Sequence, residues 1–199
     1  HYLTLKGREA LVFELDKDVE SIKMPVGKSV AYKDYLHRRY TIDYQIELDK
    51  WAEQNGATVP IFDTYFDKVG NNRVSKNLRA KTRITLSQDE YFIPDGAYFL
   101  KREGGKRLHL MEMYNGKDTG RIIRQLHKHA QALAFKCTHK QFNLDPDFSY
   151  TVDLVFQYES IMRATIERIQ EDGDCRGGRG KSTSCEEALA YGHQVGPVS

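Results

Sequence analysis

Residues 93–114 read IPDGAYFLKREGGKRLHLMEMY, and this stretch decides the fold. Tyr98 to Lys101 is typical of a β-strand, and Gly104-Gly105 supplies a turn. The alternation of apolar and polar residues from Arg107 to Tyr114 predicts a second strand. The stretch therefore predicts a two-stranded hairpin that begins just after Pro94-Asp95.

The hairpin brings two carboxylates, Asp95 and Glu112, to the ends of adjacent strands. Because side chains alternate along a strand, one face of the second strand would carry Leu108, Leu110, Glu112 and Tyr114. Mg²⁺ prefers one or two carboxylates together with water and substrate oxygens. The pair can therefore hold a divalent cation against a phosphate.

A second Pro-Asp dipeptide, Pro146-Asp147, precedes a strand-like segment and Glu159. We prefer the first dipeptide, because it has a turn between two strands and an acid on the same face. Glu159 is better placed to open a helix from Ser160 to Gln170. The alternative for the first pair is an aspartate in a turn and a glutamate on a solvated strand face.

The acidic hairpin resembles the pattern of the restriction-endonuclease-like nucleases, which is Pro-Asp, a spacer, then Glu or Asp, any residue, and Lys. The resemblance implies an α/β fold with a mixed central sheet flanked by helices. Tyr114 stands where the lysine would be, which puts ordinary hydrolysis in doubt. Its phenol could polarise a water, contact the scissile phosphate or attack phosphorus, or it could simply pack within the strand.

Composition bounds the remaining possibilities. The 199 residues suit one domain with a substantial core, and an apolar fraction of 40% argues for a folded chain. Thirty basic residues against twenty-eight acidic ones give a net charge of only +2, so any nucleic-acid site must come from local clustering.

The three cysteines, Cys137, Cys175 and Cys185, form no Cys-x-x-Cys motif and indicate a reducing, cytoplasmic compartment. No apolar run approaches the length of a membrane span, so we expect no membrane insertion. No signal peptide is visible either. The chain opens on His1 rather than Met, as a fragment of a longer protein would.

The periodicity along the chain predicts an α/β layered domain with a mixed central sheet. The expected elements are a short strand running into a helix over residues 2–11, a helix over 30–54, a strand over 58–66, the hairpin, a helix over about 120–135, a strand over 150–158 and a helix to about 171. The buried stripe of the helix after the hairpin would be Ile122, Leu126, Ala130 and Leu133. Beyond Asp172 the periodicity ends, and we expect residues 172–199 to be a largely disordered tail or linker.

The stretch from Lys68 to Arg83 holds six basic residues and no acid. Such a run can bind a phosphate backbone through charge-assisted hydrogen bonds and counterion release, although a solvated loop is the alternative. The candidate DNA-binding residues are Arg73, Lys76, Arg79 and Lys81, together with Lys117 and Arg121 after the hairpin.

Two helices supply further candidates. Gln125 and His129, one turn apart, are similar to a Gln-x-x-x-Tyr pair that many nucleases of this fold carry at that place, with a surface pair as the alternative. Asp43 and Glu47 on the long helix, preceded by His37, are candidates for a third metal ligand, unless they are simply solvated. His127 and His129 lie two apart on a predicted helix and diverge by about 200°, which disfavours a shared metal.

Taken together, these motifs resemble the replication-relaxation family and the MobC-class relaxases of mobilizable plasmids. The matching points, over about residues 1–135, are Tyr2 to Gly7, His37 with its helix to Trp51, Pro94 to Ala97, and Glu112 followed by Gly116 and a helix. Family members commonly have an acid two residues after the glutamate, where this chain has Tyr114.

The resemblance implies that residues 1–15 end an upstream winged-helix-like unit and that residues 16–171 form a restriction-endonuclease-like domain. It implies a strand-specific DNA nickase, dependent on Mg²⁺ or Mn²⁺, that acts on double-stranded plasmid DNA at an origin of transfer. Other relaxosome or coupling proteins are further candidate partners. The alternative is a non-catalytic DNA-binding accessory protein in plasmid replication or mobilization.

Overall fold

The computed structural model describes residues 5–16, 18–19, 22, 32–70, 78–145, 148 and 150–171. Its contacts divide the chain into two units, His1–Tyr35 and Leu36–Ser199. The first unit contains the helix α1 (Leu5–Leu15), none of whose residues is buried. The sheet and both predicted acids lie in the second unit.

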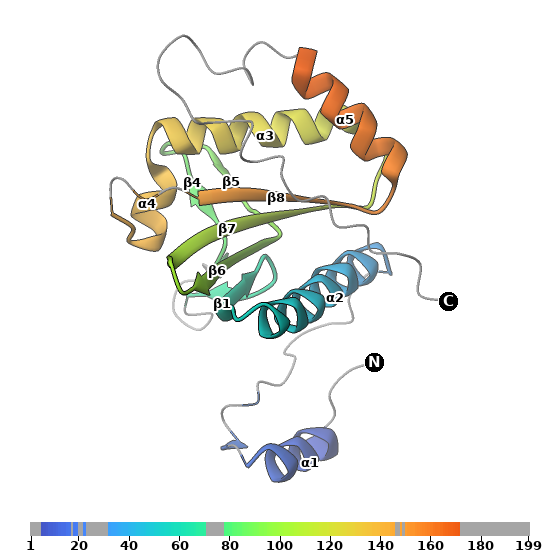
Figure 1. Cartoon of the computed structure of the whole chain (residues 1–199), viewed down its shortest axis with the longest axis vertical. Coiled ribbons are helices and arrows are strands. Elements are labelled where there is room, and N and C mark those ends of the chain that lie inside the picture. The colour runs from blue at the N-terminus through green and yellow to red at the C-terminus, as the bar shows by residue number, and fades with distance from the viewer. Residues whose placement is uncertain are drawn as a thin grey trace. The chain divides into compact units, whose positions relative to one another are not determined.

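A four-stranded mixed sheet forms the centre of the second unit (Figure 1). Its strands are β1 (Thr58–Thr64), β6 (Gly96–Arg102), β7 (Gly105–Tyr114) and β8 (Tyr150–Phe156), in that spatial order. The pairs β1/β6 and β6/β7 are antiparallel, whereas β7/β8 is parallel. A mixed α/β sheet flanked by helices is therefore confirmed.

The predicted hairpin is the pair β6 and β7. Gly96 pairs with Met111 at its open end and Arg102 with Gly105 at the turn. Gly105 has a φ of +134°, a conformation that other residues rarely adopt, so this turn requires glycine. The register places Asp95 just before the first pair and Glu112 just after it.

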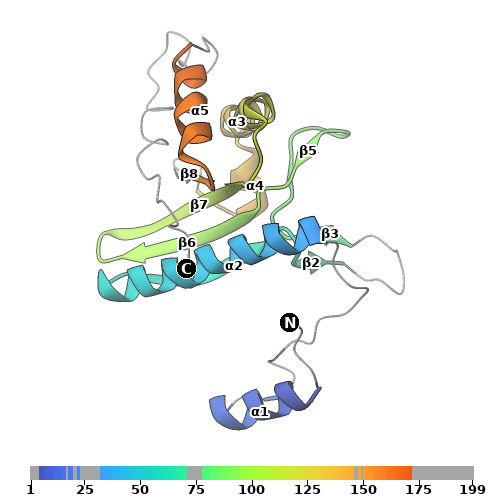
Figure 2. The ribbon, with the colours of Figure 1, turned by 90° about the vertical axis from the view of Figure 1, so that its right-hand side faces the viewer.

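Helices cover both faces of the sheet (Figure 2). On one face the helix α2 (Tyr32–Gln54) contributes Tyr40, Tyr44, Leu48 and Trp51 to a core that includes Tyr98, Met111 and Val155. On the other face, helices α3 (Thr119–Ala134) and α4 (Cys137–Phe142) contribute Ala132 and Cys137 to a core with Phe99, Leu108 and Leu110. Complete burial of a Leu or Met side chain contributes about 1.5–3 kcal/mol, so the hairpin is anchored from both sides.

Two short strand pairs and one long helix complete the unit. Strands β2 (Lys68–Val69) and β3 (Arg79–Ala80) pair with each other, as do β4 (Ile84–Thr85) and β5 (Tyr91–Phe92). Helix α5 (Glu159–Glu171) lies beside α3 (Figure 1). The sequence analysis predicted α2, β1, β8 and α5 but neither these short pairs nor α4, whose segments are too short to show a period.

The prediction for the start of the chain was partly wrong. Leu5 belongs to α1, where we expected a strand, and residues 2–4 lie outside the described part. The dipeptide Pro146-Asp147, the segment 71–77 with Arg73 and Lys76, and the tail 172–199 also lie outside it. Predictions that concern them, and the domain boundary after residue 15, stay predictions.

The prediction for the buried stripe of α3 was wrong at two positions. Ile122 is buried as expected, but Ala130 and Leu133 are exposed, and the buried positions further along are His129 and Ala132. The stripe is rotated because Gln125 and His129 turn toward the sheet, where both bind Glu112. A pattern that counts only apolar residues does not detect a face that is set by polar contacts.

None of the helices that the structure describes is long and apolar enough to cross a membrane.

Candidate active site

Asp95 lies at the end of the sheet, where its backbone is fixed from two sides. Tyr65 N donates to the Asp95 carbonyl at 3.0 Å, and the hydroxyl of Thr82 donates to the carbonyl of buried Pro94 at 2.7 Å. The Asp95 carboxylate accepts a hydrogen bond from Met113 N at 2.8 Å on Oδ2. Its position is therefore set by β7 itself rather than by a flexible loop.

The other carboxylate oxygen of Asp95 contacts α2. His37 Nε2 lies 2.8 Å from Oδ1, and both side chains are largely buried. Burial lowers the pKa of His37, but the hydrogen bond and the charge of Asp95 outweigh burial, so the pKa is raised above its ordinary value. His37 carries positive charge more readily than a free histidine and thus balances Asp95.

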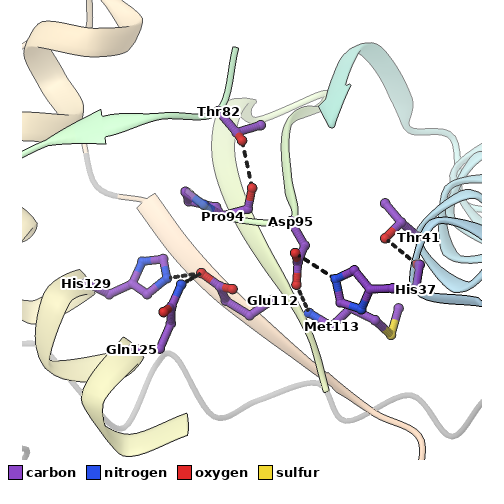
Figure 3. A network of polar contacts seen from close by, with 9 residues as sticks. All are labelled: His37, Thr41, Thr82, Pro94, Asp95, Glu112, Met113, Gln125 and His129. Carbon is purple, nitrogen blue, oxygen red and sulfur yellow. Dashed lines mark hydrogen bonds and ion pairs between the residues drawn. The ribbon is translucent and has the colours of Figure 1, made fainter. Parts of the chain in front are cut away.

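Glu112 is buried on the opposite side of the hairpin, facing α3 (Figure 3). Its Oε1 lies 2.7 Å from His129 Nε2 and accepts a hydrogen bond from Gln125 Nε2 at 3.0 Å. His129 is held in turn by an edge contact with the Phe92 ring and by the hydroxyl of Tyr150, which donates to its carbonyl. The four-residue spacing places both donors on the same face of α3.

The two acids interact electrostatically. Burial raises the pKa of Glu112, the hydrogen bond and charge of His129 lower it, and the negative charge of Asp95 raises it again. The net shift is upward, which means that the site holds its second negative charge at a cost. Pairs of interacting acids with shifted pKa values are typical of functional sites.

Tyr114 follows Glu112 by two residues and is also buried. Its ring packs against Phe156 with centroids 5.3 Å apart, and its hydroxyl has no hydrogen-bond partner within the described part of the chain. Burial raises the pKa of the Tyr114 phenol, and the charges of Glu112 and Asp95 raise it further. The phenol therefore stays protonated at the site.

The acids of α2 that we considered as a third metal ligand are placed elsewhere. Asp43 pairs with Arg39 at 3.3 Å and Glu47 with Lys50 at 2.7 Å, so each contacts its own helix. No described contact joins either acid to Asp95 or Glu112. His37 is the α2 residue that the fold brings to the hairpin.

The described basic candidates fall into two groups. Lys81 is bound to Asp63 at 2.8 Å, an ion pair that raises its pKa, and Arg79 is exposed on β3. Lys117 and Arg121 are exposed near the start of α3. The charge of Arg121 lowers the pKa of both His37 and Tyr114, which places Arg121 within electrostatic reach of the acids.

A second polar cluster, which the sequence analysis missed, lies on the α2 face of the sheet. Asp153 accepts hydrogen bonds from the Tyr98 hydroxyl, from the Tyr44 hydroxyl at 3.4 Å and from His109 Nδ1 at 3.1 Å. Rings of Tyr98 and His109 also stack. An aspartate in the middle of the otherwise uncharged segment 150–156 was the one signal that could have revealed it.

Within the described residues, no group of three or more His, Cys, Asp or Glu side chains is arranged to hold a metal ion. The chain matches no protein-family model, no curated protein and no solved structure among those compared. A functional interpretation therefore rests on the geometry of the two acids and their partners.

Proposed function

We propose that this protein is a divalent-cation-dependent DNA nickase of the plasmid-mobilization relaxase type, built on a restriction-endonuclease-like fold. The observation that supports this best is the coupled pair Asp95 and Glu112 at the open end of one hairpin. Each acid is bound by a histidine from a different helix, so two layers of the fold converge on the pair.

The residues present fit a Mg²⁺ or Mn²⁺ ion held by two carboxylates. His129 and Gln125 both bind Oε1 of Glu112, while no described contact engages Oε2. Each Asp95 oxygen accepts one described hydrogen bond and keeps a lone pair. With only two protein carboxylates, the remaining ligand positions would fall to water and phosphate oxygens, as Mg²⁺ prefers.

When bound, such a cation would stabilise charge on the scissile phosphate and lower the pKa of a water molecule. The chain's own residues prepare the site for it. His37 and His129 orient the two carboxylates, as histidine partners commonly do around metal ligands, and Gln125 holds Glu112 in the same rotamer. Tyr114, protonated and buried, is suited to donate a hydrogen bond to a phosphate or water oxygen.

The substrate in this proposal is double-stranded plasmid DNA at an origin of transfer, in a cytoplasmic relaxosome. The motif order in the sequence supports this part of the proposal. The exposed basic residues near the start of α3, Lys117 and Arg121, support an approach of phosphates to the acids.

A non-catalytic DNA-binding accessory protein is the second candidate. It is favoured by Tyr114 at the position where the nucleases have lysine. It is also favoured by the two donors that already satisfy Oε1 of Glu112.

Metal binding separates the two candidates without knowledge of the DNA target. Titration of Mn²⁺ into the full chain, followed by electron paramagnetic resonance, should show one bound ion that Asp95→Asn and Glu112→Gln each abolish. Mg²⁺ should then convert supercoiled plasmid carrying a mobilization origin to open circles. Equal Mn²⁺ binding by wild type and both variants would contradict the proposed site.

A further inference from the structure

We infer that Arg124 and Arg168 form a clamp for a backbone phosphate of the DNA strand, beside the acid pair and over Gly120. The identity of the polyanion rests on the proposed function, but the clamp itself is argued from the side chains. Neither arginine was a candidate in the sequence analysis, since Arg168 lies on a helix 44 positions further along the chain.

The two guanidinium groups converge from different helices. Arg124 projects from α3 and Arg168 from α5, and a Cβ atom added to Gly120 would lie 3.4 Å from Nη1 of the first and 3.8 Å from Nη1 of the second. Arg168 Nη1 donates to the hydroxyl of Thr119 at 2.6 Å, which fixes its position at the start of α3. Because residue 120 is glycine, the space between the two groups is left open.

Charge balance at this place favours an anion. The described contacts give Arg124 one acidic neighbour, Asp118, whose Oδ2 is 3.9 Å from Nη2, and this side chain is also the N-cap of α3. Lys117 and Arg121 add positive charge within the same turn, and all four basic residues are exposed. Like charges that converge repel one another, so a phosphate between them would remove this cost.

An unsatisfied buried group links the clamp to the acids. The Tyr114 side chain is 91% buried by its 9% relative exposure, and its hydroxyl has no described partner. It interacts electrostatically with Glu112 and Asp95 on one side and with Arg121 on the other. A buried hydroxyl without a partner is costly, and a phosphate oxygen entering from the basic side would satisfy it.

A polynucleotide fits this arrangement better than free phosphate. The basic groups extend from Arg168 through Arg124 to Arg121, while the acid pair lies beyond Arg121. This order matches successive phosphates of one strand, with the scissile phosphate at Asp95 and Glu112 and a neighbouring phosphate in the clamp.

The test is equilibrium binding of a fluorescent 30-base-pair duplex by the full chain in EDTA, where no cleavage occurs, at several KCl concentrations. Replacing Arg124 and Arg168 by Ala should weaken binding about tenfold per arginine near 50 mM salt and reduce the salt slope by about 0.9 per lost contact. Arg163→Ala is the matched control, because Arg163 is an exposed arginine of α5 that pairs with Glu159. It should change affinity less than twofold.

A second variant keeps both arginines and blocks the space between them. Gly120→Glu should weaken duplex binding about as much as the double alanine variant, whereas Gly120→Ala should not. Both substitutions favour helix formation, so loss of folding does not explain the difference. Unchanged affinity and slope in the double alanine variant and in Gly120→Glu would overturn the inference.

Two further arms separate the alternatives. Binding of inorganic phosphate by calorimetry with no effect of the variants on duplex affinity would assign the clamp to a free anion and overturn the inference. Asp95→Asn should bind the duplex as wild type does. If it does, and the clamp variants do not, the clamp stands even where nicking is absent and the proposed enzyme activity fails.

Discussion

The two faces of the central sheet each bury an acid beside a histidine, but the two clusters are completed differently. On the α2 face, Asp153 accepts hydrogen bonds from two tyrosines and His109, so its carboxylate is surrounded by donors. On the α3 face, Glu112 has two donors on one oxygen, none described on the other, and the charge of Asp95 nearby. The first arrangement stabilises a fold, whereas the second retains capacity for a ligand.

Position along the strands reinforces this difference. Asp153 pairs with Met111 inside the β7/β8 ladder, and its tyrosine partners hold α2 and β6 together. Asp95 and Glu112 lie at the open end of the β6/β7 hairpin, where a substrate can approach. The same residue types thus serve packing in one cluster and chemistry in the other.

The largest expected effect is on nicking. Asp95→Asn and Glu112→Gln should each reduce the rate of plasmid nicking by about a hundredfold or more, because one ligand of a two-carboxylate site is worth several kcal/mol in the transition state. Asp153→Asn, the matched change in the other cluster, should leave the rate of the folded protein within a few fold. Equal losses in all three variants would remove the distinction between the clusters.

Stability should respond in the opposite order. Asp153→Ala leaves three buried donors without their acceptor and should lower the free energy of unfolding by about 3 kcal/mol. Glu112→Gln removes a buried charge whose pKa is raised and should change the free energy of unfolding by less than about 1 kcal/mol. Urea denaturation followed by circular dichroism measures both, and a larger loss for Glu112→Gln would contradict the comparison.

The hairpin and its two acids could be predicted from the sequence, because turn residues and a period of two are local signals. The partners of the acids could be predicted only in part. Gln125 and His129 carried a four-residue spacing, but that they face the sheet depends on the rotation of α3. The contact between His37 and Asp95 joins residues 58 positions apart, and Asp153 meets its tyrosines only after β8 pairs with β7. Such contacts depend on tertiary packing and leave no periodic pattern.

The two histidines that orient the acids should also differ. His129 is almost completely buried, so His129→Ala should lower the free energy of unfolding by about 2 kcal/mol through a cavity and an unpaired Glu112. His37 is about one-fifth exposed, and His37→Ala should cost about 1 kcal/mol because water can replace the imidazole. Thermal melts of the two variants test this order, and His37→Ala as the more destabilising change would contradict it.

The smallest expected effect concerns Tyr114, and it decides the mechanism. A relaxase that rejoins the strand after transfer normally conserves the phosphodiester energy in a covalent bond between tyrosine and DNA. Attack by Tyr114 would require its phenolate. Burial and two neighbouring carboxylates raise the pKa of this phenol, so the attacking form is disfavoured at the site.

Tyr114→Phe should therefore reduce nicking by less than about tenfold, the effect of losing one hydrogen bond to a phosphate or water oxygen. Because the hydroxyl has no described partner in the folded chain, the variant should be at least as stable as the wild type. Wild-type reactions stopped in denaturant should yield no protein joined to DNA. A peptide that carries DNA on Tyr114, together with complete loss of nicking in Tyr114→Phe, would assign the covalent mechanism instead, and would require a bound cation or Arg121 to stabilise the phenolate that the free site disfavours.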